Sequence, residues 1–342
     1  LSPSTKIFYP EGNDKMKKNA EFLASYIKEI TGYELATATG QPGKGISLVI
    51  DQSIQNPEGY QLTVSDNGIR IAGSTDAGVF YGIQTLRKSI PATAQGMNVE
   101  LPAATINDYP RFAYRGMMLD VSRHFFPVDS VKTYLDILAL HNQNTFHWHL
   151  SDDQGWRIEI KKYPELAEIG GQLPNNGRKG GYYTQEEFKD LVNYANERFI
   201  TIIPEVDIPG HTAAIFAAYP DFKNAVKFKT NVNIPGQAFN ALDVDDPKAM
   251  QFTEDVIAEL AALAPGNYIH IGGDEAIGLP HDKFVRFINK TREIVLKNGK
   301  KMVGWQETAR ADISEGDVIQ HWIYLKQKNE DSSKKKDNIP AE

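Results

Sequence analysis

The chain has 342 residues, 41% of them hydrophobic and 24% charged, which is typical of globular proteins and excludes a disordered or fibrous class. Its formal net charge of -7 offers no positive field for a phosphate backbone, so we expect no nucleic-acid partner. The absence of cysteine excludes disulfides and thiolate metal sites, and the apolar runs are too short to span a bilayer, which needs roughly 20 residues.

The first part of the chain has the pattern of a small α+β domain. Apolar residues recur at steps of three and four over 13–30, which predicts an amphipathic helix, and a second helix is expected over 75–88. The expected strands are 46–50, 60–64 and 69–72, with Asn67-Gly68 suited to a tight hairpin between the last two. Prolines between 102 and 110 mark a boundary. We therefore predict an accessory α+β domain over residues 1–105.

From residue 106 onward, short apolar strands alternate with longer amphipathic segments, a pattern typical of βα units and a parallel sheet. The expected strands are 116–121, 145–150, 200–206, 268–272, 301–305 and 318–322. The expected helices are 128–141, 184–198, 247–263 and 283–297, the second opening with a Thr184–Glu187 capping box.

Six βα units without a dinucleotide-binding glycine fingerprint favour a (β/α)8 TIM barrel over a Rossmann sheet, so the predicted class is α/β. A full barrel needs eight strands, and the tail 326–342 is too polar to supply them. We therefore expect a catalytic TIM barrel over 106–342 that lacks its last strands.

Polar residues cluster after each expected strand of this barrel. The carboxyl ends of the strands carry the active site in such barrels, so the repetition predicts a site there. A single acidic residue after a strand is as readily a helix cap, and only the repetition favours a site. The clusters are 120–124, 149–153, 205–207, 273–275, 305–307 and 321–322.

Asp274 and Glu275 follow two glycines at the end of an expected strand. Glycine lets the backbone leave the alternation of a strand, so both carboxyl groups can face one cavity. Neighbouring carboxyls disfavour double ionisation, so one can stay protonated while the other is charged. This division of labour suits glycosidic cleavage, although the dipeptide alone is a weak signal.

Four stretches of the chain carry a longer pattern. They are LDVSRHFF at 119–126, HWHLSDDQGWR at 147–157, PEVDIPGH at 204–211 and HIGGDE at 270–275. In order and spacing they resemble the family 20 glycoside hydrolases, and the resemblance covers nearly all of residues 1–322. It implies an exo-acting β-N-acetylhexosaminidase that hydrolyses terminal β-linked N-acetylglucosamine or N-acetylgalactosamine from oligosaccharides or glycoconjugates.

By that resemblance, Glu275 is the general acid and later the general base. Asp274 orients the substrate's own 2-acetamido group, whose carbonyl oxygen attacks the anomeric carbon to give an oxazolinium intermediate, with retention of configuration. Asp207 and His211 match a pair that hydrogen-bonds behind the acid. Considered alone, His211 could equally cap a helix.

The same resemblance implies the walls of a sugar pocket. Arg123 matches an arginine that grips the sugar's O3 and O4, with Asp152 as its partner; the alternative is a surface ion pair. Trp305 and Trp322 match tryptophans that pack around the acetamido methyl group and the sugar face. Both tryptophans could otherwise be core residues.

His147 and His149 invite a metal interpretation, because alternate residues of a strand share a face. No further ligands complete such a site in the sequence, so we expect no metal and no other cofactor, and we assign His149 to hydrogen bonding in the sugar pocket. A metal-dependent barrel hydrolase is therefore one rival. Another is a truncated or inactive sugar-binding homologue, which the missing strands favour and the intact carboxylates oppose.

The resemblance to family 20 also implies a periplasmic, cell-surface or secreted location. The sequence does not indicate an oligomeric state, nor which of the two N-acetylhexosamines is preferred.

Overall fold

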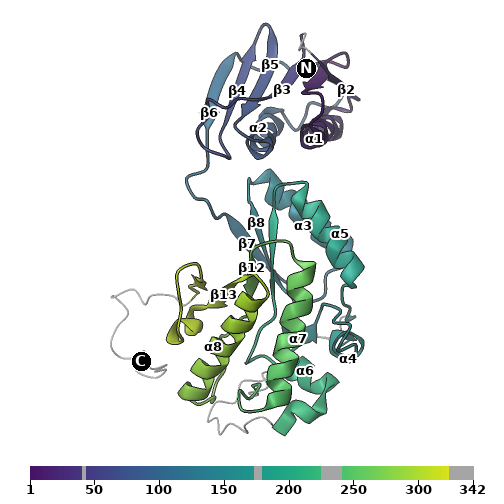
Figure 1. Ribbon diagram of the computed structural model, residues 1–342. Helices are drawn as coiled ribbons and strands as arrows, with labels where there is room; N and C mark the ends of the chain where they lie inside the picture. The colour runs from purple at the N-terminus through teal and green to yellow at the C-terminus, as the bar shows by residue number, and fades with distance from the viewer. Residues whose placement is uncertain (41–43, 173–178, 225–240, 323–342) are drawn as a thin grey trace, which may run out of the picture.

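The computed structural model describes residues 1–40, 44–172, 179–224 and 241–322, which form two parts joined by one connection (Figure 1). The tail 326–342, expected to be too polar for strands, lies outside the described residues. Among the described helices, none combines the length and apolarity needed to cross a membrane.

The first part is a six-stranded mixed sheet with two helices on one face (Figure 1). The predicted hairpin between β4 and β5 is confirmed, with Ser65 paired to Gly68 across the turn. The last strand pairs with β4 and spans the expected boundary at residue 105. The elements are β1 (Lys6–Tyr9), α1 (Asp14–Thr31), β2 (Ala36–Thr39), β3 (Ile46–Ile50), β4 (Tyr60–Ser65), β5 (Gly68–Gly73), α2 (Asp76–Ser89) and β6 (Ala104–Asp108).

The second part is built on a six-stranded sheet in which every neighbouring pair is parallel, in the order β7-β8-β11-β12-β13-β14. All six predicted strands are confirmed within two residues at each end. The strands are β7 (Gly116–Asp120), β8 (Thr145–His149), β11 (Thr201–Glu205), β12 (Tyr268–His270), β13 (Lys301–Trp305) and β14 (Val318–Gln320), and a separate small hairpin joins β9 (Ser151–Asp152) to β10 (Gly155–Trp156).

Helices connect successive strands of this sheet and line its outer side (Figure 1). The predicted Thr184 capping box at the start of α5 is present, with both of its hydrogen bonds formed. Sequential parallel strands alternating with helices give an α/β fold of TIM-barrel type. The helices are α3 (Val128–Leu140), α4 (Glu165–Glu168), η1 (Gly170–Gln172), α5 (Gln185–Asn196), α6 (Ala213–Ala218), η2 (Pro220–Asn224), α7 (Pro247–Leu263), α8 (His281–Lys297) and η3 (Gln306–Arg310).

The two outermost strands of the parallel sheet expose apolar side chains. Met117 and Met118 of β7 are 51% and 40% exposed, and Val318 of β14 is 38% exposed. By contrast, every residue of β8, which has a neighbour on both sides, is buried. The sheet therefore ends in two strands whose side chains are not covered by the described residues.

A carboxylate of the first part holds the amino-terminal ends of two strands of the second. Glu58 accepts hydrogen bonds from both Nη atoms of Arg115, at 2.9 and 3.0 Å, and from Asn144 Nδ2 at 3.3 Å. Arg115 directly precedes β7 and Asn144 directly precedes β8. Burial opposes ionisation of Glu58, but hydrogen bonds from Arg115 and Tyr81 outweigh it and lower the pKa of this carboxyl.

Replacing Glu58 with glutamine should lower the free energy of unfolding by about 2 kcal/mol, between the values for surface and fully buried ion pairs, because the pair is partly exposed. Urea unfolding at pH 7 measures this. The pKa of Glu58 is depressed on folding, so its contribution exists above the unfolded value and the difference between the proteins should shrink as the pH falls below 4.5. Glu34→Gln, in the exposed Lys28–Glu34 pair, should cause no measurable change.

Candidate active site

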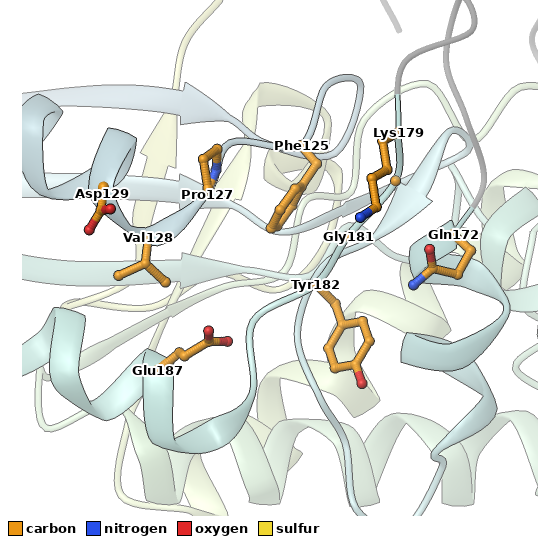
Figure 2. A pocket seen from close by; sticks show the side chains of 10 residues that line it. Phe125, Pro127, Val128, Asp129, Gln172, Lys179, Gly181, Tyr182 and Glu187 are labelled. Atoms are coloured by element: carbon orange, nitrogen blue, oxygen red, sulfur yellow. The ribbon is translucent and has the colours of Figure 1, made fainter.

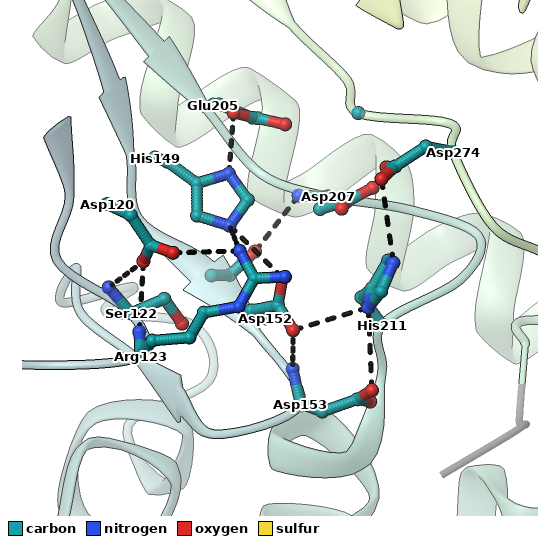
Figure 3. A network of polar contacts seen from close by, with 12 residues as sticks. Asp120, Ser122, Arg123, His149, Asp152, Asp153, Glu205, Asp207, His211 and Asp274 are labelled. Carbon is teal, nitrogen blue, oxygen red and sulfur yellow. Dashed lines mark hydrogen bonds and ion pairs between the residues drawn. The ribbon is translucent and has the colours of Figure 1, made fainter. Parts of the chain in front are cut away.

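The predicted site residues lie at or after the carboxyl ends of the strands, and Figure 3 shows those around Arg123, Asp152 and His211. Because all six strands of the sheet run in one direction, these ends meet at the same edge. The residues, with the strands that they end or follow, are Arg123 (β7), His149 (β8), Asp152 (β9), Asp207 and His211 (β11), Asp274 and Glu275 (β12), Trp305 (β13) and Trp322 (β14).

The turn that carries Asp274 and Glu275 depends on two glycines. Gly272 and Gly273 have φ values of +69° and +92°, a region that favours glycine. A Cβ on Gly272 would lie 1.8 Å from the Oδ1 atom of Asp207, so no other residue fits there. The N–H of Gly273 donates to the same oxygen at 3.0 Å. The glycines thus let the turn lie directly against Asp207 and leave Asp274 less exposed than Glu275, with side chains 17% and 35% exposed.

His211 lies between this turn and a second pair of carboxylates (Figure 3). Its Nδ1 atom is 3.2 Å from Asp152 Oδ1 and 3.4 Å from Asp153 Oδ2. Its Nε2 atom is 3.6 Å from a carboxylate oxygen of Asp274 and 3.6 Å from one of Glu275. The resemblance placed Asp207 with His211. Ligand atoms of Asp207, His211 and Asp274 lie within 4.8 Å of one another, while Asp207 Oδ1 accepts the Gly273 N–H and the shortest contacts of the His211 ring are with Asp152 and Asp153.

Burial and charge set different protonation states within this cluster. Burial, and then the charge of Asp274, raise the pKa of Asp207 well above its usual range. Burial opposes protonation of His211, but Asp152, Asp153 and Asp274 outweigh it and raise the pKa of the imidazole. Burial also opposes ionisation of Asp152, yet hydrogen bonds from histidines lower the pKa of that carboxyl. The cluster therefore holds a cationic His211 beside an ionised Asp152, whereas the protonated form is favoured at Asp207.

Arg123 is held by carboxylates on two sides. Its Nη2 atom is 2.7 Å from Asp152 Oδ2, as the sequence predicted, and its Nη1 atom is 2.8 Å from Asp120 Oδ2. Asp120 Oδ1 also accepts the backbone N–H groups of Ser122 and Arg123, which fixes the loop itself. The Arg123 side chain remains 37% exposed, so its guanidinium group is held in place and is still accessible from solvent.

Two family profiles match the chain in its two parts. The profile of domain 2 of glycosyl hydrolase family 20 matches residues 1–109, and that of the catalytic domain of the same family matches residues 112–283. The chain belongs to glycosyl hydrolase family 20. The resemblance that the four sequence stretches carried is thereby confirmed.

Individual relatives agree with this assignment. A beta-hexosaminidase of Porphyromonas gingivalis is 36% identical over 339 residues, which cover 90% of this chain and 44% of the relative. A beta-N-acetylhexosaminidase of Cellulomonas fimi is 36% identical over 268 residues, which cover 78% of this chain and 53% of that protein. The chain thus spans about half the length of these curated relatives.

Solved structures of the family have the same fold. The GH20 beta-N-acetylhexosaminidase of Streptomyces coelicolor A3(2) superposes with a TM-score of 0.85 at 38% identity, covering 94% of this chain and 66% of that one. A mutant Streptomyces plicatus beta-hexosaminidase in complex with product (GlcNAc) superposes with a TM-score of 0.87 at 39% identity, covering 96% and 66%.

Trp305, at the end of β13, and Trp322, just after β14, differ in exposure. Trp305 is 9% exposed, and its indole N–H donates to Glu205 Oε1 at 2.8 Å. Trp322 is 42% exposed, and its indole N–H donates to Glu307 Oε2 at 3.0 Å. Each ring is therefore oriented by one carboxylate, which keeps it in a fixed pose with part of its surface available.

Those carboxylates were not among the predicted site residues. Glu205 and Glu307 stood in the quoted stretches and clusters, but a lone acidic residue after a strand is also a common helix cap. Glu205 is fully buried, and burial raises the pKa of Glu307. Asp153, whose Oδ2 atom is 3.4 Å from His211 Nδ1, lies in the stretch 147–157 but was not among the predicted site residues either.

The histidines that suggested a metal site instead surround Glu205. His147 Nε2 and His149 Nδ1 each donate to Glu205 Oε2 at 2.6 Å. The donor atoms of His147, Glu205 and His270 lie close enough to share an ion, but the rings of His147 and His270 are stacked 4.4 Å apart at 17°. Stacked rings do not aim their nitrogens at one point, so this donor set fits a tetrahedral metal site poorly.

A hollow of about 720 Å³ lies between residues 125–129 and residues 179–187 (Figure 2). It is lined by Phe125, Val128 and Tyr182 among others, and by none of the predicted site residues. Glu187 at its edge already caps α5 by accepting the Thr184 N–H. The acidic residues that line it are Asp129 and Glu187, and Glu187 is already engaged as a helix cap, so the cluster around Asp274 and His211 (Figure 3) is the better candidate for glycosidic chemistry.

Proposed function

We propose that this chain is an exo-acting β-N-acetylhexosaminidase that hydrolyses terminal β-linked N-acetylhexosamine by a retaining, substrate-assisted mechanism. One observation supports the proposal most: Asp274 and Glu275 lie side by side on a glycine turn, with His211 3.6 Å from a carboxylate oxygen of each. The names of the relatives support the substrate class.

In the proposed mechanism, Asp274 binds the N–H of the substrate's acetamido group and turns its carbonyl oxygen toward the anomeric carbon. That oxygen forms a bond to the carbon as the glycosidic bond breaks, and Glu275 gives its proton to the departing oxygen. The cyclic cation is then opened by water, whose proton returns to Glu275. His211, whose Nε2 atom lies 3.6 Å from a carboxylate oxygen of Asp274, would help to hold that carboxylate toward the positive intermediate.

The remaining predicted residues act in positioning and sugar binding. Arg123 and Asp152 would hold sugar hydroxyl groups, with His149 supporting Asp152 by donating its Nε2–H. Trp305 and Trp322 would pack on the acetamido group and the sugar face. Asp207, which accepts the Gly273 N–H, would keep the catalytic turn in place.

We propose further that the parallel sheet is part of an eight-stranded barrel. The exposed apolar side chains of β7 and β14 support this, because two more strands between them would cover both edges. The accessory α+β domain and the barrel would divide in the connection between β6 and β7. A periplasmic, cell-surface or secreted location is also proposed, because glycans of this class are commonly met outside the cytoplasm, and cell fractionation tests it.

The activity is tested by comparing p-nitrophenyl N-acetyl-β-glucosaminide with p-nitrophenyl β-glucoside, which differs in lacking the acetamido group. We expect release of nitrophenol from the first substrate only, and competitive inhibition by a thiazoline mimic of the oxazolinium ion. Equal hydrolysis of both substrates would contradict acetamido participation.

The same assay separates the rivals. Binding of the thiazoline without turnover would indicate a sugar-binding homologue. Loss of turnover after dialysis against a chelator, restored by a divalent metal, would indicate a metal-dependent hydrolase instead.

A further inference from the structure

A buried carboxylate lies beneath the site and touches residues on both of its sides. Glu205, the last residue of β11, has a side chain with no exposed surface. Its Oε2 atom accepts hydrogen bonds from His149 and His147 at 2.6 Å each. Its Oε1 atom accepts the indole N–H of Trp305 at 2.8 Å, and His270 Nδ1 lies 3.4 Å from the same oxygen.

On one side, this carboxylate reaches the sugar clamp through His149. The other ring nitrogen of His149, Nε2, is 3.2 Å from Asp152 Oδ2 and 3.1 Å from Arg123 Nη1. A ring that is fixed at Nδ1 has its Nε2 position fixed as well, because the imidazole is rigid. The orientation of the clamp is therefore set from below by Glu205.

On the other side, Glu205 reaches the pocket wall directly. Trp305 ends β13 and is 9% exposed, so its ring borders the site while its N–H points down to the carboxylate. A buried indole N–H needs an acceptor. Without Glu205, Trp305 would have to turn to find another one.

The charges agree with this geometry. Burial opposes ionisation of Glu205, but the histidines around it, His149 first, hold the pKa of the carboxyl well below its usual value. Burial opposes protonation of His149, but Glu205 and Asp152 outweigh it and raise the pKa of the imidazole well above its usual value. The charged groups facing His149 are Glu205 from β11, Asp152 from β9, and Arg123 and Asp120 at the end of β7.

We propose that Glu205 is a positioning residue of the active site, which holds the Arg123–Asp152 clamp through His149 and the pocket wall through Trp305. It is buried beneath the residues proposed to meet the sugar and acts through them. This inference rests on the proposed function, since it assigns the groups that Glu205 orients to sugar binding.

Glu205→Gln keeps the shape of the side chain but loses its charge. At pH 7 we expect KM for p-nitrophenyl N-acetyl-β-glucosaminide to rise about 10-fold, with kcat within about 3-fold of wild type, because the clamp binds ground state and transition state alike. Glu58→Gln is the matched control, since it also removes a partly buried, ion-paired carboxylate, but one remote from the site. It should leave KM unchanged.

The pH dependence separates positioning from a loss of packing. Without the Glu205 charge, burial lowers the pKa of His149, so the imidazole loses its proton as the pH rises through the lowered value. The ratio of variant to wild-type KM should therefore be larger at pH 8 than at pH 5. In Glu205→Gln combined with His149→Gln this pH dependence of the ratio should disappear.

A Glu205→Gln protein with wild-type KM at every pH would overturn the inference while leaving the proposed function intact. An inactive wild-type chain that also fails to bind the thiazoline would instead overturn the proposed function. If Glu205→Gln does not fold, the kinetics of the His149→Gln variant test the inference instead. We expect this variant to have a raised KM with little change in kcat. An unchanged KM would contradict the positioning role.

Discussion

Replacing Glu275 with glutamine should lower kcat for p-nitrophenyl N-acetyl-β-glucosaminide by about 10²- to 10⁴-fold, the range that general acid–base catalysis contributes. The amide preserves the shape of the side chain but neither donates a proton to the leaving oxygen nor accepts one from water. Because the Glu275 side chain is 35% exposed, losing its charge should not cost the fold its stability. KM should change little, and steady-state kinetics measures both quantities.

The loss should also depend on the leaving group. Nitrophenolate departs readily without a proton, whereas the sugar alkoxide of N,N′-diacetylchitobiose does not, so the wild-type to variant ratio should be larger for chitobiose. Glu254→Gln, on the surface of α7 beside Lys297, is the control and should retain wild-type rates. If the Glu275→Gln variant kept the wild-type kcat on both substrates, Glu275 could not be the general acid and base.

Local patterns were enough to predict the elements and the face of the sheet that carries the site. Strands such as β13, at 301–305, are short apolar runs between turn signals. The start of α5 was predicted from the capping box at Thr184. The contact of Arg123 with Asp152 was implied by the family resemblance, and in the structure these two residues follow neighbouring strands of the sheet.

Contacts between side chains on loops that follow different strands could not be predicted in this way. The resemblance grouped Asp207 with His211, but nothing in the sequence indicates that the His211 ring lies nearest to Asp152 and Asp153, which follow another strand. The choice depends on Gly272, whose missing side chain lets Asp207 lean toward the β12 turn. Glycine at that position was noted for its backbone freedom, and its close approach to a carboxylate has no signature in the sequence.

Buried charges are the other feature that the sequence could not reveal. Charged residues are seldom fully buried, so neither Glu205 nor Arg157 stood out from its quoted stretch. Each is buried only because groups from several separate segments converge on it, and convergence of that kind is a property of the folded chain.

The buried guanidinium of Arg157 is an example, because main-chain groups from several parts of the chain meet at it. Arg157 is 1% exposed and donates to main-chain oxygens from four separate segments of the chain. They belong to Val121, Ser122, Gln154, Gly171 and Gly181. Two of these oxygens lie in the loop that carries Arg123. Gly155 makes room for the guanidinium, because a Cβ there would lie 2.3 Å from its central carbon.

Arg157→Met should therefore lower the free energy of unfolding by about 4 kcal/mol, because several buried carbonyls lose their donor at about 1–3 kcal/mol each and relaxation recovers part of the loss. Urea unfolding measures it, with Arg286→Met, in an exposed ion pair with Asp245, as a control that should show no comparable change.

The same variant should raise KM, because the freed loop no longer holds Arg123 against Asp152. A loss of stability with an unchanged KM would mean that Arg157 supports the fold alone and that Asp120, which bonds the same loop at two backbone N–H groups, is sufficient to hold the clamp. An unchanged unfolding midpoint would mean that water replaces the guanidinium at these carbonyls, which their burial opposes.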